Sequence, residues 1–171
     1  IAQGQQGGKR LPVARSWQTA RQKAPDANLL LISIAGEYAA GLADQALDND
    51  CNVMMFSDNV SLEQEIPLKK KASSKKLIVM GPDCGTAIIN GAGLCFANAV
   101  CRGSIGIVGA SGTGSQELSV RIHEVGGGVS QLIGTGGRDL SEKIGGLTML
   151  DAIAMLEADE NTQAIVLISK P

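Results

Sequence analysis

The residues best suited to binding an anion lie in one glycine-rich turn, Gly109-Ala110-Ser111-Gly112-Thr113-Gly114. The turn follows an apolar run at 105–108 that predicts a buried strand, and it precedes a predicted helix at 115–125. Glycines let the backbone turn sharply and approach a ligand closely. A helix N-terminus has unpaired N–H groups and the positive end of the helix dipole. The combination of strand, glycine turn and helix start therefore predicts a site for a phosphate or another anion.

The standard phosphate-binding fingerprints do not match this turn. Gly109 and Gly114 have the spacing of the P-loop glycines, but Ser115 and Gln116 follow where that motif needs Lys and Ser or Thr. Thr113 and Gln116 have the spacing of a capping box, which predicts that they pair at the start of the helix. A tight strand-to-helix turn without a ligand remains the alternative to an anion site.

Composition limits the function further. The chain has 171 residues, a net charge of −2 and 2% aromatic residues, which does not favour binding to nucleic acid or to an anionic membrane. No apolar run reaches the roughly 20 residues of a membrane helix. The four cysteines form no CxxC pair, so we expect free thiols in a reducing cytoplasm and no metal site. Because the chain begins at Ile1 and ends directly after an apolar run, we expect an internal piece of a longer protein.

Apolar runs alternate with helical segments along the chain, which predicts an α/β fold with parallel strands. In the first part, predicted strands at 29–34, 51–56 and 77–80 alternate with predicted helices at 38–48 and 62–74. In the second part, strands are predicted at 105–108, 130–133 and 164–169, and helices at 115–125 and 149–159, the latter capped by Thr148 or Asp151.

Three loops of the first part follow directly after predicted strands. They are Ala35–Tyr38, Ser57–Val60 and Gly81–Thr86. Ligands of open α/β sheets bind at the carboxyl ends of the strands. We therefore expect these three loops to form one pocket.

Several motifs resemble those of a known family. Residues 81–90 resemble the Gly-Pro-Asn-Cys-Pro-Gly segment that closes the CoA-binding domain of succinyl-CoA synthetase α subunits. Residues 106–113 and 134–139 resemble the phosphate-facing helix start and the next glycine-rich loop of that family, in the same order. Over nearly the whole chain, a closer resemblance is to the FdrA family of acyl-CoA-synthetase-like proteins. Its signatures are matched at 35–38, 54–60, 109–114 and 136–140.

The resemblance implies a fold and an activity. A linker and weak helix at 1–26 would precede a Rossmann-like CoA-binding domain at 27–103, and 104–171 would be a truncated flavodoxin-like, parallel-sheet domain of the succinyl-CoA synthetase type. The implied activity is that of an NDP-forming acyl-CoA synthetase, in which a carboxylate is activated as an acyl phosphate and CoA displaces the phosphate. Two alternatives stay open: carbamoyl transfer of the oxamate carbamoyltransferase type in anaerobic allantoin catabolism, and a non-catalytic module that binds a nucleotide or a partner.

The resemblance also implies the site residues and ligands. CoA and ATP or ADP are the candidate cofactors, the substrate is a small anion, and the protein forms a homo-oligomer or a hetero-oligomer with other subunits. The implied contacts to CoA or a nucleotide are Ala35, Gly36, Glu37, Ser57, Asn59, Asp83 and Cys84. The implied phosphate or anion contacts are Ser111, Gly112, Thr113, Gly114, Gly136, Gly137 and Arg138.

The catalytic group is not identified by the resemblance. The phosphohistidine of the synthetases lies in a segment beyond this chain, and His123, in the middle of a predicted helix, does not correspond to it. Lys170 stands where the synthetases have a glutamate, and a cation there would hold a phosphate or a carboxylate directly. Lys170 and Arg138 are the candidate catalytic residues, and in the carbamoyl-transfer alternative they would hold carbamoyl phosphate or oxamate together with Ser111 and Thr113. We expect Cys84 to be a buried thiol that shapes the pocket.

Overall fold

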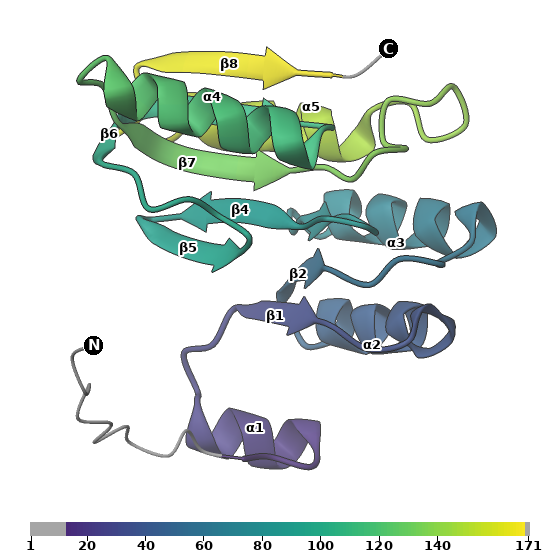
Figure 1. Ribbon diagram of the computed structural model, residues 1–171. Coiled ribbons are helices and arrows are strands. Elements are labelled where there is room, and N and C mark those ends of the chain that lie inside the picture. Colours follow the sequence, from purple (N-terminus) through teal and green to yellow (C-terminus); the bar gives the residue numbers. More distant parts are fainter. Residues whose placement is uncertain (1–12, 170–171) are drawn as a thin grey trace, which may run out of the picture.

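The computed structural model describes residues 13–169, which form two α/β units, each with its own sheet (Figure 1). The sheet of the first unit has three parallel strands in the order β1-β2-β3. Its elements are α1 (Trp17–Lys23), β1 (Leu29–Ile32), α2 (Gly36–Asp48), β2 (Asn52–Met55), α3 (Leu62–Ser74) and β3 (Val79–Met80).

The second unit has five strands in the order β5-β4-β7-β6-β8. Strands β6, β7 and β8 are parallel, whereas β4 runs antiparallel to both β5 and β7. The elements are β4 (Thr86–Ile89), β5 (Ala92–Cys95), β6 (Arg102–Gly109), α4 (Gly112–Glu124), β7 (Val129–Gly134), α5 (Leu147–Glu157) and β8 (Ala164–Ile168). The predicted α/β class with parallel strands is confirmed, and the fold is Rossmann-like.

The two sheets divide between Met80 and Thr86. The hairpin of β4 and β5 precedes residue 103, yet it is hydrogen-bonded to the second sheet through β7. Its strands are too short and too weakly apolar to reveal this partner from sequence. The division into domains at residue 103 stays a prediction.

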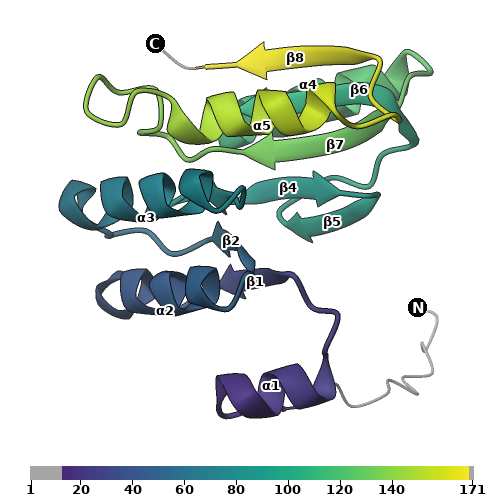
Figure 2. The same cartoon turned by 180° about the vertical axis from the view of Figure 1, so that it is seen from behind.

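Residue types explain how the helices cover the sheets. On α2, small side chains recur at helical spacing, and Ala39, Ala43 and Ala46 are fully buried, so the helix lies close to the sheet. The helix α3 begins with a capping box of Ser61 and Gln64. Helices α4 and α5 cover opposite faces of the second sheet, and α5 lies on the same side of the molecule as α3 (Figure 2).

A cluster of charged side chains joins the units where α3 meets the loop between β7 and α5. We call Glu65, Lys69, Arg138 and Asp139 the interunit ion cluster. Lys69 Nζ lies 3.0 Å from Glu65 Oε1 and 2.7 Å from Asp139 Oδ1, and all three side chains are at most 1% exposed. Lys69 also donates to the carbonyl of Thr135 at 3.0 Å. The cluster therefore ties the first unit to the glycine-rich loop of the second.

Asp139 also caps the N-terminus of α5. Its carboxylate accepts hydrogen bonds from the backbone N–H groups of Thr148 (3.2 Å) and Met149 (2.9 Å). The expected capping of this helix by Thr148 or Asp151 is wrong. A residue eight positions before the helix supplies the acceptor, because the loop folds back and places a negative charge at the positive end of the helix dipole.

Candidate functional site

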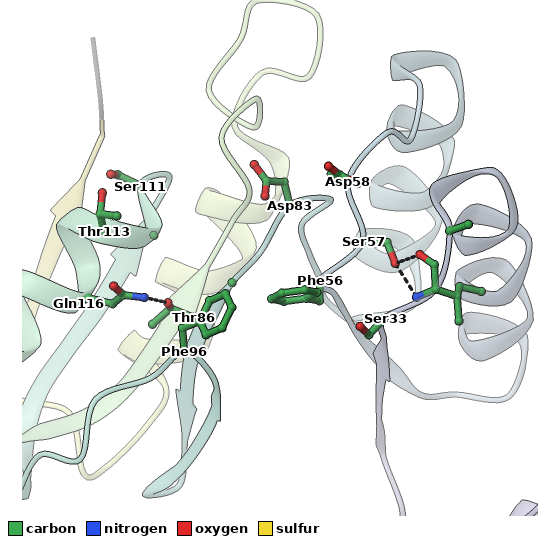
Figure 3. Close-up of a pocket in the computed structure, with 14 residues that line it drawn as sticks. Ser33, Phe56, Ser57, Asp58, Asp83, Thr86, Phe96, Ser111, Thr113 and Gln116 are labelled. Carbon is green, nitrogen blue, oxygen red and sulfur yellow. Dashed lines mark hydrogen bonds between the residues drawn. The ribbon is translucent and has the colours of Figure 1, made fainter.

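A cavity of about 690 Å³ lies between the two units (Figure 3). It is bounded on one side by the loops after β1 and β2 and on the other by the start of α4. The expectation that the three loops after the strands of the first unit form one pocket agrees with this arrangement. The lining residues are Ser33, Ile34, Ala35, Phe56, Ser57, Asp58, Asp83, Gly85, Thr86, Phe96, Ser111, Gly112, Thr113 and Gln116.

The wall from the first unit is held by one serine and one glycine. Ser57 Oγ accepts from the Ile34 N–H at 3.0 Å and donates to the Ile34 carbonyl at 2.6 Å, which fixes the two loops together. At Gly36, an added Cβ would lie 2.1 Å from the backbone oxygen of Asp58. The close approach of the two loops therefore requires glycine at the start of α2.

The third loop is anchored to the same wall. Asp83 donates its N–H to the Ser57 carbonyl, and Cys84 donates to the Met55 carbonyl, both at 3.0 Å. Asp83 has a φ of 57°, a left-handed conformation that Asp and Asn adopt more readily than most residues. This backbone places the Asp83 side chain at the cavity (Figure 3).

The opposite wall is the N-terminus of α4. Ser111 is its N-cap, and Ser111 Oγ accepts from the Gly114 N–H at 3.3 Å. The predicted capping box of Thr113 and Gln116 is wrong, because the helix begins at Gly112 and Thr113 already lies inside its first turn. Ser111, Gly112 and Thr113 line the cavity, which therefore lies at the end of the helix where the first N–H groups have no backbone partner within the helix.

Gln116 has a role that the sequence pattern concealed. Its Nε2 donates to Thr86 Oγ1 on β4 at 2.7 Å, and the amide oxygen points toward Ser111 and Thr113 (Figure 3). Gln116 and Thr86 both line the cavity. The partner is 30 residues away in sequence, so only the packing of α4 against β4 reveals the pair.

Two aromatic rings meet across the cavity. Phe56 follows β2 in the first unit, and Phe96 follows β5 in the second. Their centroids are 5.4 Å apart with an interplanar angle of 69°, an edge-to-face arrangement. Both phenylalanines of the chain thus lie here, and Phe96 is 66% exposed. Neither was among the predicted site residues, since nothing in the sequence places the two segments side by side.

The charged side chains that line the cavity are acidic. Asp58 and Asp83 are the charged residues among its lining, and within residues 13–169 no Lys, Arg or His lines it. Asp58 Oδ1 accepts from Asn59 Nδ2 at 2.8 Å. Any attraction for an anion on this part of the chain therefore comes from the helix N-terminus and the neighbouring hydroxyl groups.

Several expected site residues do not line this cavity. Cys84, Gly136 and Gly137 line a crevice of about 20 Å³ that shares Asp83, Gly85, Thr86 and Gly112 with the larger cavity. Lys170 lies outside the described residues. The other expected residues outside the cavity lining are Gly36, Glu37, Asn59, Gly114 and Arg138.

Arg138 and Cys84 do not lie in environments that would make them reactive. Arg138 Nη2 lies 2.8 Å from Glu65 Oε2 and donates to the Val60 carbonyl, so its guanidinium belongs to the interunit ion cluster. Cys84 is 3% exposed, and its Sγ lies 3.5 Å from the Gly134 carbonyl. Burial raises the pKa of the Cys84 thiol to about 11, so it stays protonated at neutral pH.

His123 lies near the C-terminal end of α4, away from the cavity. Its Nδ1 accepts from the Cys101 N–H at 3.3 Å, and it lines a separate groove beside β4 and β5. Within the described residues, no helix combines the length and the apolar character that crossing a membrane requires.

Comparisons with known proteins agree with this architecture. A family model described as CoA binding domain matches residues 102–171. The Escherichia coli (strain K12) protein YahF is 72% identical over 153 residues, which cover 90% of this chain and 30% of YahF. The alpha subunit of the ADP-forming succinate–CoA ligase of Aquifex aeolicus is 31% identical over 156 residues, which cover 86% of this chain and 49% of that subunit.

A solved structure shows the same fold. A mutant of the ATP citrate lyase of Methanosaeta concilii, in complex with (3S)-citryl-CoA, superposes with a TM-score of 0.78 at 21% identity. The match covers 92% of this chain and 27% of the lyase. The chain is therefore homologous to the alpha subunits of succinate–CoA ligases, and it spans about a third to a half of the relatives that it matches.

Proposed function

We propose that this chain is the CoA-binding and phosphoryl-binding part of an NDP-forming acyl-CoA synthetase-like protein. The observation that carries the proposal is the cavity between the units, where the carboxyl ends of β1 and β2 face the N-terminus of α4. Relatives named as succinate–CoA ligases support it. CoA, when bound, would supply the thiol that takes the acyl group from an acyl phosphate and releases inorganic phosphate.

The two walls of the cavity would bind different parts of the reactants. The N–H groups of Gly112 and Thr113 and the hydroxyl of Ser111 would hold the phosphoryl group and stabilise the charge that grows on it as the C–O bond breaks. The rings of Phe56 and Phe96 would pack against the thiol end of the CoA arm and the acyl group that it receives. The thiol proton leaves with the phosphate, so this step needs no buried base from residues 13–169.

Calorimetric titration of the full-length protein with CoA tests the proposal. We expect micromolar affinity that falls at least tenfold in Phe96→Ala, because the exposed ring contributes contact area without supporting the core. Val125→Ala is the matched control, since Val125 is 84% exposed and lies outside the cavity. No binding by the wild-type protein would contradict the proposal.

Carbamoyl transfer of the FdrA type is the second candidate. The observation that favours it is the set of acceptors around the cavity, Asp58, Asp83 and the amide oxygen of Gln116, which can accept N–H groups of a carbamoyl substrate. Titration with carbamoyl phosphate in the absence of CoA separates the two activities. Binding of either ligand without turnover in the complete protein would instead indicate a non-catalytic module.

The partners and the nucleotide site belong to the same proposal. The ligase relatives are named as alpha subunits. We infer that this protein assembles with further copies or further subunits. These parts, together with chain segments outside residues 13–169, would supply the ATP or ADP site and the catalytic group, for which Lys170 is a candidate.

A further inference from the structure

The side of the cavity that belongs to the first unit combines apolar and acidic groups. Ile34, which is 44% exposed, and Phe56 line it, and the ring of Phe96 packs against that of Phe56 from the second unit. The carboxyl group of Asp58 lies on this side, and that of Asp83 lies between Asp58 and Ser111 (Figure 3). The opposite side presents the hydroxyl groups of Ser111 and Thr113 and the helix N-terminus.

Among the described residues, the cations of the interunit ion cluster have other partners than Asp58 and Asp83. Arg138 is paired with Glu65, and Lys69 is buried between Glu65 and Asp139. Within residues 13–169, Asp58 and Asp83 form no salt bridge. A negatively charged group placed beside them would meet repulsion that water screens only in part.

We infer that the cavity selects acyl groups that carry no second negative charge, as in straight-chain aliphatic monocarboxylic acids, and excludes dicarboxylic acids. The inference rests on the proposed function. If α4 holds the phosphoryl group, an acyl chain that extends away from α4 reaches the side of the cavity where Phe56 and Phe96 lie. A methyl terminus buries apolar surface there. A carboxylate terminus loses its water and faces Asp58 and Asp83.

Butyryl-CoA and succinyl-CoA provide a matched pair of probes, because both acyl chains have four carbons and differ in the terminal group. Both are titrated into the full-length protein with inorganic phosphate present, so that the anion site at α4 is filled. We expect butyryl-CoA to bind at least tenfold more tightly than succinyl-CoA. In Phe96→Ala, the affinity for butyryl-CoA should fall more than the affinity for CoA.

The carboxylates are tested with the double variant Asp58→Asn/Asp83→Asn. Asparagine keeps the side-chain shape and tolerates the left-handed backbone at Asp83. The affinity for succinyl-CoA should rise at least fivefold, with little change for butyryl-CoA. The control Glu117→Gln/Glu124→Gln removes the same charge from the exposed face of α4 and should leave both affinities unchanged.

Each outcome decides a different claim. If CoA binds but the two thioesters bind equally, or the double variant leaves their ratio unchanged, this inference is overturned and the proposed function stands. Tighter binding of succinyl-CoA also overturns the inference. If neither CoA nor a thioester binds, the proposed function fails and the inference falls with it.

Discussion

The two units meet in two regions of opposite character. In the interunit ion cluster, Lys69, Glu65 and Asp139 are buried, and Lys69 and Arg138 together balance the two carboxylates. In the cavity, Asp58 and Asp83 face open space without a cation from the described residues. Buried charges that are paired hold the units together, whereas carboxylates at the ends of strands that have no cation among the described residues are available to a ligand.

Removing Lys69 should destabilise the interunit ion cluster. In Lys69→Met, Asp139 stays buried without a cation and Glu65 keeps only Arg138, which costs about 3–5 kcal/mol in the free energy of unfolding. Urea denaturation measures this loss. Lys71→Met is the control, because Lys71 pairs with Asp44 and Asp48 at the surface and should change stability far less. Equal losses in the two variants would show that the cluster does not join the units.

Cys84 lines the small crevice next to the cavity, and its thiol should make the free energy of unfolding depend on pH. Its pKa is raised by burial to about 11 from 9.0, so the folded state keeps the proton that the unfolded state loses. Stability should therefore be unaffected by this group below pH 9 and fall by about 2–3 kcal/mol as the pH rises through 11.

The comparison of wild type with Cys84→Ala isolates this effect from other groups that titrate in the same range. The difference in unfolding free energy between the two proteins should change between pH 9 and pH 11. A constant difference would mean that the thiol is not held in its neutral form.

Gly36→Ala should distort the wall of the cavity. The new Cβ would lie 2.1 Å from the backbone oxygen of Asp58, so the wall of the cavity must move. We expect a loss of about 1–3 kcal/mol in stability and weaker binding of CoA. In the same helix, Gly41 has no atom within 4 Å of an added Cβ, so Gly41→Ala should stabilise by about 0.5–1 kcal/mol. Identical behaviour of the two variants in denaturation and titration would refute the close approach.

The smallest effect concerns the start of α4. Ser111→Ala removes the acceptor for the Gly114 N–H and should cost about 1 kcal/mol, whereas Thr113→Ala should cost less because Thr113 is not the cap. Thermal denaturation of both variants measures the difference. A larger loss in Thr113→Ala would indicate that Thr113 caps the helix, as the capping-box spacing in the sequence predicted.

Local sequence patterns predicted the strands and helices whose residue types show a clear periodicity. Apolar runs such as 29–34 and 51–56 predict buried strands, and the helical spacing of Leu42, Ala46 and Leu47 predicts a helix like α2. The same reasoning placed the loops after β1, β2 and β3 at one site, because the carboxyl ends of parallel strands share an edge.

Contacts distant in sequence were not predictable in this way. Lys69 and Asp139 are 70 residues apart, and Gln116 and Thr86 are 30 apart. A local pattern assigned Gln116 to a helix cap, and the family resemblance assigned Arg138 to an anion, whereas packing gives both of them other partners. Phe56 and Phe96 meet only because the two units are folded against each other.

Hydrogen–deuterium exchange of the full-length protein, with and without CoA, tests the difference between the two regions most directly. We predict that CoA slows exchange at 33–37, 56–59, 83–86 and 111–116, while 65–69 and 147–149 stay unchanged because they are already closed. Protection confined to the groove beside β4 and β5, or no protection in the presence of saturating CoA, would contradict the assignment of the cavity as the binding site.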